Sequence, residues 1–233
     1  MIEVSGLRKA FRTHEVLHDV GLSLRPGTLH GLVGANGAGK TTLLHCLYGL
    51  HHDYQGTVRE TTGLPIRPST GLLRYEPYFY PRLTGREYLE LTLQARGRAV
   101  VDFEGWNQLL ELPLDQYAEQ YSAGMKKKLA LLALLVQPFR YFILDEPFNG
   151  LDLNTNLLLM EILRRLRGQG AGILLTSHLL GSLTELCDEL TVLADGTVRR
   201  HYLAHEFEQV HNDLIDGFYQ DKLAQVRRLL PLE

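Results

Sequence analysis

GANGAGKTT, residues 34–42, is the stretch of this sequence that decides the fold, and it comprises Gly34, Ala35, Asn36, Gly37, Ala38, Gly39, Lys40, Thr41 and Thr42. Glycines at this spacing let successive backbone N–H groups point inward around phosphate oxygens. Lys40 can then reach the β and γ phosphates, and Thr41 can offer its hydroxyl to Mg²⁺. A glycine-rich turn without a ligand would not need a lysine followed by a hydroxyl at this register. We therefore predict a site for a magnesium nucleoside triphosphate, with ATP as the expected nucleotide.

The segments on either side of residues 34–42 supply the setting that a phosphate-binding loop requires. The run LHGLVG before the loop predicts a buried strand, and the run TTLLHCLYGL after it has helical periodicity and ends near Gly49. A helix that begins here directs the positive end of its dipole at the anion. Two further β-type runs, IEVSGL and EVLHDVGLSL, precede the loop and predict a small sheet.

A second set of candidate residues follows the apolar run YFILDE, which predicts a buried strand over residues 141–144. Ligands of open α/β sheets usually lie at the carboxyl ends of the strands. We therefore expect Asp145 to hold Mg²⁺ through a water and Glu146 to polarise the attacking water. A further apolar strand, GILLTSH, ends on His178, which can hydrogen-bond the γ phosphate or orient Glu146. Alone, either feature would be interpreted as structural, and the phosphate loop favours the catalytic interpretation.

A small-residue turn, YSAGM, opens the strongly helical run MKKKLALLALLV. Ser122, Ala123, Gly124 and Met125 form a second helix N-terminus that can bind an anion, with the Ser122 hydroxyl and the amides near Gly124 as donors. By itself this pattern is only a capped helix. The lysines from Lys126 to Lys128 are interpreted as a solvated helix face.

The rest of the chain predicts an α/β protein with an inserted helical lobe. From about residue 75 to 135, REYLELTLQAR, NQLLELPLDQY and MKKKLALLALLVQ carry apolar residues at helical spacing. The run ELTVLADGTV adds a strand and a hairpin-like Asp195-Gly196 turn. Apolar strands that alternate with helices predict a buried parallel sheet. The tail from about Asn212 predicts an amphipathic helix.

Composition excludes several other classes of protein. The 233 residues carry a net charge of −3, which gives no strong electrostatic attraction to polyphosphate backbones, so we expect no nucleic-acid partner. The two cysteines, Cys46 and Cys187, are far apart and read as core residues in a reducing compartment. No signal peptide is recognised, and no segment reaches the roughly 18 uninterrupted apolar residues of a membrane-spanning helix. We expect a protein that stays inside the cell.

The order of these motifs over nearly the whole chain resembles the nucleotide-binding subunit of ABC transporters. YSAGM corresponds to the signature motif of that family, and residues 149–152, NGLD, correspond to its D-loop, which includes Asp152. The resemblance implies a head-to-tail dimer in which the signature of one subunit closes over the ATP held by the other. It also places Phe11 where an aromatic ring stacks on adenine, which favours ATP.

The resemblance further implies the fold class and its subdivisions. The expected fold is α/β, a P-loop NTPase with a RecA-like core, an N-terminal antiparallel β subdomain and an inserted α-helical subdomain. We predict one ABC ATPase domain over residues 1–233. Residues 1–74 and 136–211 would form the ATP-binding core, residues 75–135 the helical subdomain and residues 212–233 a C-terminal helix.

One position departs from the family pattern. A glutamine that touches Mg²⁺ and contacts the membrane partner is expected within residues 73–77, LRYEP, and none is present. Alignment on the following YPRLT puts Tyr75 at the glutamine position. Glu76 lies next to it and can act as an oxygen ligand for the metal if the loop shifts; a plain loop acid is the alternative.

The resemblance implies an ATPase subunit that energises transport, and YSAGM with LDEPFNGLD favours export. The expected partners are transmembrane permease subunits and a second nucleotide-binding subunit, as a homo- or heterodimer. The expected location is cytoplasmic, peripheral on the inner face of the cell membrane. One alternative is a soluble ABC-type ATPase that remodels a non-membrane partner, although the second cassette, coiled coil or basic extension usual there is not found. Another is a binding module with weak hydrolysis, against which Glu146 and His178 argue.

Overall fold

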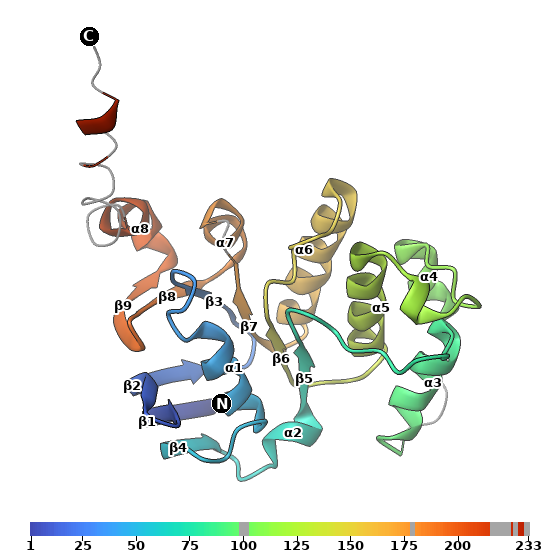
Figure 1. The fold of residues 1–233 in the computed structure, drawn as a ribbon, viewed down its shortest axis with the longest axis horizontal. Helices are drawn as coiled ribbons and strands as arrows, with labels where there is room; N and C mark the ends of the chain where they lie inside the picture. Colours follow the sequence, from blue (N-terminus) through green and yellow to red (C-terminus); the bar gives the residue numbers. More distant parts are fainter. Residues whose placement is uncertain (98–102, 178–179, 215–224, 226–227, 231–233) are drawn as a thin grey trace.

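The computed structural model describes residues 1–97, 103–177, 180–214, 225 and 228–230, and these residues form two sheets with helices around them (Figure 1). The larger sheet has the strand order β5-β6-β7-β3-β8-β9. Its strands are β3 (Leu29–Val33), β5 (Thr70–Leu73), β6 (Tyr141–Leu144), β7 (Gly172–Thr176), β8 (Glu189–Ala194) and β9 (Thr197–Leu203).

The larger sheet confirms the predicted parallel core. β5, β6, β7, β3 and β8 pair in parallel, and β9 pairs antiparallel to β8 through the predicted turn at Asp195 and Gly196. Because the strands are parallel, the carboxyl ends of β3, β6 and β7 meet at one edge of the sheet. Residues that directly follow these strands are therefore brought together.

The smaller sheet confirms the predicted antiparallel structure at the N-terminus. Its strands are β1 (Ile2–Phe11), β2 (His14–Leu24) and β4 (Gln55–Glu60), in the order β2-β1-β4. At the tight turn between β1 and β2, Arg12 adopts a φ of 55°.

The helices connect the strands and cover the sheets. The α-helices of the described residues are α1 (Lys40–Tyr48), α2 (Ile66–Ser69), α3 (Gly85–Gln94), α4 (Glu104–Leu110), α5 (Ala123–Leu135), α6 (Leu153–Gly168), α7 (Leu180–Leu186) and α8 (Phe207–Leu214). Two short 3₁₀ helices, η1 (Ala118–Gln120) and η2 (Ala204–Glu206), complete them. Figure 1 shows α3, α4 and α5 grouped at one side of the molecule, away from the antiparallel sheet, where the inserted helical lobe is expected.

Two helical expectations differ from the structure. Only the first part of NQLLELPLDQY, residues 107–110, is helical, because α4 ends at Leu110 where Glu111 turns to a φ of 55°, and Pro113 cannot continue a helix. Near the C-terminus, α8 begins at Phe207, ahead of the expected start at Asn212. Most of the tail predicted as an amphipathic helix lies outside the described residues.

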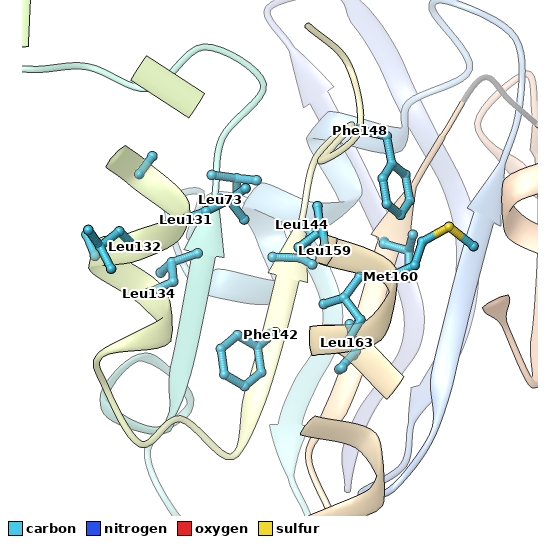
Figure 2. Packing of buried hydrophobic residues seen from close by; sticks show 14 of the residues in the cluster. Leu73, Leu131, Leu132, Leu134, Phe142, Leu144, Phe148, Leu159, Met160 and Leu163 are labelled. Carbon is cyan, nitrogen blue, oxygen red and sulfur yellow. The ribbon is translucent and has the colours of Figure 1, made fainter. Parts of the chain in front are cut away.

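Successive residues of the central strands enter two different hydrophobic clusters. On β6, Phe142 and Leu144 pack against α5 and α6, and Figure 2 shows this first cluster. Tyr141 and Ile143 point the other way, into a cluster formed with α1 and the antiparallel sheet. Burial on both faces explains why these strands read as apolar runs without alternation. Each fully buried leucine or isoleucine stabilises the fold by about 1.5–3 kcal/mol.

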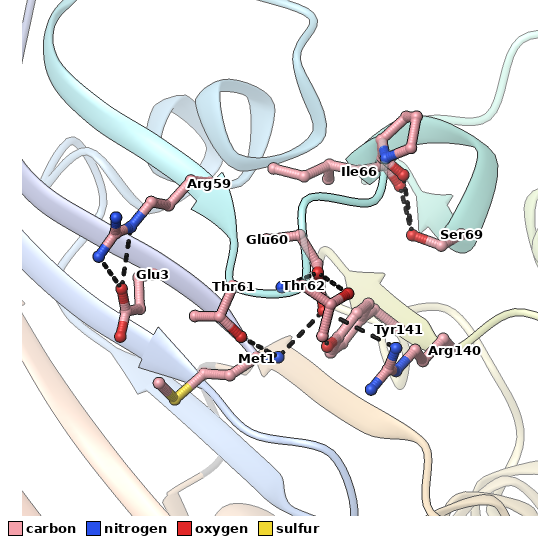
Figure 3. Close-up of polar contacts among 11 residues, drawn as sticks. Met1, Glu3, Arg59, Glu60, Thr61, Thr62, Ile66, Ser69, Arg140 and Tyr141 are labelled. Carbon is pink, nitrogen blue, oxygen red and sulfur yellow. Dashed lines mark hydrogen bonds and ion pairs between the residues drawn. The ribbon is translucent and has the colours of Figure 1, made fainter.

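A buried carboxylate joins the two sheets at one corner, as Figure 3 shows. Glu60, the last residue of β4, accepts a hydrogen bond from the Tyr141 hydroxyl at 3.1 Å and one from the Thr62 N–H at 2.6 Å. It also pairs with the α-amino group of Met1 at 3.1 Å. The pKa of Glu60 is lowered to about 2, chiefly by the hydrogen bond from the Thr62 hydroxyl. Burial opposes this shift, whereas the bonds from the Thr62 N–H, the α-amino group and Tyr141 add to it.

A second polar cluster, centred on the buried Glu189, lies at the opposite end of the parallel sheet from the phosphate loop. Glu189 at the start of β8 pairs with His30 at 3.1 Å, with His201 at 3.3 Å and with Arg25. Burial alone would raise the pKa of Glu189, but the hydrogen bonds and charges of His30 and Arg25 lower it overall. The pKa of His201 is also lowered, first by burial and then by the His30 charge.

Candidate functional site

The phosphate loop leaves the buried strand β3 and leads directly into α1. A Cβ atom on Gly34 would lie 2.2 Å from the carbonyl oxygen of Leu193 on the neighbouring strand β8. Gly39 caps α1 with a φ of 102°, and a Cβ there would lie 2.8 Å from the Leu17 side chain. Only glycine fits these two positions, and the loop can therefore follow a tight path around the helix N-terminus.

Lys40 is held within this loop. Its side chain is buried, and its Nζ donates to the carbonyl oxygens of Gly34 at 2.7 Å and Ala35 at 3.2 Å. Burial lowers the pKa of Lys40, and the nearby carboxylates of Glu146 and Asp145 partly oppose this shift. The ammonium group thus lies between the loop and the acidic pair, where a phosphate can exchange for the carbonyl partners.

Asp145 joins the phosphate loop to the strand ends. Its Oδ2 accepts a hydrogen bond from the Thr41 hydroxyl at 2.7 Å, and its Oδ1 accepts one from the Thr176 hydroxyl at 2.8 Å. Thr176 ends β7, is fully buried, and was not assigned a role from the sequence. The signal was available, since a hydroxyl at the end of a strand next to the acidic pair is a natural partner for a carboxylate.

Glu146 follows Asp145 in an unusual backbone conformation. Its φ of 49° lies in the left-handed region, which few residues other than glycine adopt. Its N–H donates to the Thr176 hydroxyl at 2.8 Å, and its carbonyl oxygen accepts from the Lys127 ammonium at 3.1 Å. Both peptide groups of Glu146 are therefore held by side chains from neighbouring elements.

The interpretation of residues 126–128 as a solvated helix face is wrong for Lys127. This side chain is buried, with 5 % of the residue exposed, because it lies on the side of α5 that faces the end of β6. Its Nζ also donates to the carbonyl oxygen of Tyr75 at 3.0 Å. Three consecutive lysines are typical of a charged surface, and no local pattern distinguishes the middle one from its neighbours.

These groups surround one cleft of about 460 Å³. The cleft is lined by Val16, Ala35, Asn36, Gly37, Gly39, Lys40, Thr41, Thr42, Tyr75, Asp145 and Glu146. Most of the residues predicted for phosphate, metal and water thus come together. Within the described ranges, no group of three or more His, Cys, Asp and Glu could hold a metal ion. A single carboxylate and a hydroxyl suit Mg²⁺, which keeps several waters and binds phosphate oxygens.

Two of the residues predicted for adenine and metal, Phe11 and Glu76, do not line this cleft. Phe11 is 43 % exposed. The Lys9 ammonium lies 4.2 Å from the centroid of its ring, and the centroid of the His51 ring lies 5.3 Å from it. The neighbouring strand β2 contributes Val16 to the cleft. Glu76 is exposed and does not line the cleft, whereas Tyr75 does. His178 lies outside the described residues.

The residues of the YSAGM turn and the D-loop form a second group, outside the cleft. The Ser122 hydroxyl caps α5 by accepting the Met125 N–H at 3.2 Å. A Cβ on Gly124 would lie 2.8 Å from the carbonyl oxygen of Gly150, so the two segments are adjacent. Asp152 caps α6, and hydrogen bonds from Thr155 lower the pKa of its carboxyl.

A parallel sheet that delivers a glycine loop, a lysine, a threonine and an acidic pair to one cleft defines a phosphate-loop nucleoside triphosphatase. The family model described as ABC transporter matches residues 17–149, which is more than half of the chain. The chain belongs to the ABC transporter family.

Individual relatives cover nearly the whole chain. The SkfA peptide export ATP-binding protein SkfE of Bacillus subtilis is 28% identical over 219 residues, which span 90% of this chain and 92% of that protein. A solved ATP binding subunit of an ABC transporter superposes with a TM-score of 0.84 at 27% identity, covering 96% of this chain and 98% of that one. The dimeric ATP-binding cassette MJ0796, in a post-hydrolysis state bound to ADP and Pi, shares the fold with a TM-score of 0.77 at 22% identity, over 88% and 99% of the two chains.

The chain is therefore the ATP-binding and ATP-hydrolysing subunit of an ABC transporter, as the motifs predict. Membership of this family implies transmembrane partners. In the part of the chain that the structure describes, no helix combines the length and apolarity needed to cross a bilayer.

Proposed function

We propose that this chain drives export by working as a dimer that closes on two ATP molecules, hydrolyses them and reopens. The dimer would sit on the cytoplasmic face of the membrane and pass its motion to separate transmembrane permease subunits. The similarity to SkfE, an ATP-binding protein of peptide export, supports the direction of transport.

The separation of the two anion-binding groups carries the proposal. The cleft holds the phosphate loop and the acidic pair, but its lining includes none of the described residues 122–125. The N-terminus of α5 instead opens next to Gly150, on the surface that carries Asp152. A second nucleotide-binding subunit, identical or related, would bring its own Ser122 and Gly124 over the ATP in this cleft. The dimeric cassette MJ0796 has the same fold and supports this arrangement.

Within each cleft we assign the phosphate chemistry to five side chains. Lys40 would bind the β and γ phosphates, and Thr41 with Asp145, which already share a hydrogen bond of 2.7 Å, would hold Mg²⁺. The metal, when bound, neutralises charge on the phosphate oxygens. Glu146 lines the cleft and would take a proton from the attacking water, and His178 would orient that water.

Phe11 and Glu76 do not line the cleft, and we assign them supporting roles. Phe11 would stack on adenine once its ring exchanges the Lys9 and His51 contacts for the base. Glu76 would add an oxygen ligand near Mg²⁺ if the loop shifts toward the cleft, because Tyr75 occupies that place here.

We assign permease docking to a partly apolar groove beside the helical lobe. A groove of about 660 Å³ lies between α3, α5 and the loop after β5. Tyr78 and Tyr80 on its rim are 65 % and 56 % exposed. Exposed aromatic side chains at this density are typical of protein interfaces, since they offer both apolar area and a polar hydroxyl.

Glu146→Gln tests the proposal most directly. The amide cannot accept a proton from water, so ATP should bind with little turnover and an ATP-loaded dimer should accumulate in gel filtration with Mg²⁺. Lys40→Ala should abolish ATP binding or turnover. Glu161→Gln, on the exposed face of α6 where Glu161 pairs with Arg165, is the matched control and should behave as wild type. Undiminished hydrolysis by Glu146→Gln would remove this residue from its role.

Purification of the native complex separates the transporter from the alternative of a soluble remodelling ATPase. Co-purification of a protein with several membrane spans, lost when Tyr78 and Tyr80 are both changed to serine, would support the permease partner and its docking groove. A ribosomal or DNA-bound partner in its place would favour the alternative.

A further inference from the structure

Lys127 is a buried charge that the phosphate chemistry does not use. It lies on α5, the helix that begins with the YSAGM turn, and its ammonium donates to the carbonyl oxygens of Tyr75 at 3.0 Å and Glu146 at 3.1 Å. The ammonium also lies 5.5 Å from the centroid of the Tyr75 ring. Removing a charge from water is costly, so a lysine in this position needs a compensating role.

The neighbouring lysines differ from Lys127. Lys126 and Lys128 are only half-buried, and Lys128 pairs with Asp152 at 3.4 Å. Lys127 is bound instead by two backbone carbonyls, and the Asp145 and Glu146 carboxylates oppose the lowering of its pKa by burial. The Lys127 ammonium, carried on α5, is thus stabilised by the charges of Asp145 and Glu146 and lies beside the Glu146 backbone.

The Lys127 contact acts on a residue whose backbone is strained. Glu146 has a φ of 49°, and side chains hold it in that conformation from both ends. Thr176 accepts its N–H and Lys127 donates to its carbonyl oxygen. A residue in the left-handed region persists only where its surroundings hold it there. The direction of the Glu146 carboxylate therefore depends on these two bonds.

Lys127 also fixes the loop that forms another wall of the cleft. It binds the Tyr75 carbonyl, and the Tyr75 hydroxyl accepts a hydrogen bond from the Asn149 side chain at 3.1 Å. One ammonium group thus joins α5, the loop after β5 and the turn after β6. Tyr75 and Glu146 both line the cleft.

We propose that Lys127 is the positioning residue that links Glu146 to the helix whose N-terminus closes the partner's ATP site. Lys127 lies five positions after Ser122, which corresponds to about 7.5 Å along the helix axis. Because a helix moves as a rigid rod over this length, a displacement of the YSAGM turn reaches the Glu146 carbonyl through Lys127. Closure over one ATP thereby adjusts the hydrolytic residue at the other. This inference rests on the proposed dimer and on the proposed role of Glu146.

Lys127→Met tests the inference, since it keeps the length of the side chain and removes the ammonium. We expect kcat for ATP to fall by about ten- to a hundredfold, the range seen when a supporting contact of a reactive group is lost. KM and ATP affinity should stay within twofold of wild type, because the phosphate loop is intact. The ATP-loaded dimer should persist as it does for Glu146→Gln. Lys126→Met, one position earlier on the same helix, should leave kcat unchanged.

A double variant separates positioning from a purely structural role. If Lys127 acts through Glu146, Lys127→Met should not further slow the residual turnover of Glu146→Gln. Lys127→Arg, which restores donors to the carbonyls, should recover part of kcat. Weakened ATP binding, loss of the dimer or an additive double variant would overturn the inference. If Lys127→Met has a normal kcat while Glu146→Gln is inactive, the inference about Lys127 fails and the proposed function stands. If Glu146→Gln is active, the proposed function itself fails.

Discussion

Replacing Thr176 with valine should destabilise the fold although the two side chains have nearly the same shape. Thr176 is fully buried, and its hydroxyl accepts the Glu146 N–H at 2.8 Å and donates to Asp145 at 2.8 Å. Valine satisfies neither group. An unsatisfied buried polar group costs about 1–3 kcal/mol, and a hydrogen bond to a charged group contributes about 1.5–3 kcal/mol. Allowing for partial relaxation, we expect a loss of about 3 kcal/mol in the free energy of unfolding.

Urea denaturation followed by circular dichroism measures this loss. With a slope of about 3 kcal/mol per molar urea for a domain of this size, the midpoint should fall by about 1 M. Thr176→Ser keeps the hydroxyl and removes one methyl group, which costs only about 1 kcal/mol. The order of stability should therefore be wild type, then serine, then valine.

The same variant should raise the Mg²⁺ concentration needed for half-maximal hydrolysis, because Asp145 loses the bond that fixes its orientation toward Thr41. If Thr176→Val unfolds at the same urea concentration as Thr176→Ser or at a higher one, the hydroxyl does not hold the acidic pair. The reasoning about both Asp145 and Glu146 would then be refuted.

Three further changes test other parts of the structure. Gly34→Ala places a Cβ 2.2 Å from a carbonyl oxygen and should lower stability by about 1–3 kcal/mol in urea denaturation, whereas Gly105→Ala, in open space on α4, should not; equal midpoints would contradict the steric argument. Tyr75→Gln restores the residue type of the family, and unchanged coupling of ATPase activity to transport in the assembled complex would make this position incidental. The pKa values of Glu189 and His201 are lower in the folded chain than in the unfolded chain, so the unfolded chain takes up protons first as the pH falls. The free energy of unfolding should therefore decline below about pH 6.5 because of His201, and below about pH 4.3 because of Glu189. Glu189→Gln should make the decline below about pH 4.3 shallower, while the part due to Glu60, whose pKa is also lowered, should remain. An unchanged profile of urea midpoint against pH would show that this cluster does not contribute to the decline.

Most of the fold could be predicted because its signals are local. Buried strands in a parallel sheet are apolar on both faces, and α1 ends at Gly49, whose φ of 77° is a common helix stop. The end of α4 at Leu110 could not be predicted from periodicity, because the apolar spacing of residues 107–117 is helical throughout. The left-handed Glu111 and Pro113 end the helix there.

The candidate site could be predicted only in part. The phosphate loop and the Asp145–Glu146 pair follow from residue types at fixed spacing, because each residue type there suits one part of the phosphate chemistry. The hydrogen bonds that hold Asp145 could not be predicted, because they join residues far apart in the sequence. Thr41 lies 104 positions before Asp145, and Thr176 lies 31 positions after it.

The sequence by itself determined which chemistry this protein can perform: a glycine loop, a lysine and an acidic pair fit a magnesium nucleoside triphosphate wherever the chain places them. Only the tertiary structure decided how that chemistry is supported. Whether Lys127 faces solvent or the site depends on which side of α5 meets β6, and that side is set by packing between segments far apart in the chain. Such packing leaves no local pattern in the sequence. The buried Lys127 stands in a run of three lysines, and nothing in that run distinguishes it from the more exposed Lys126 and Lys128.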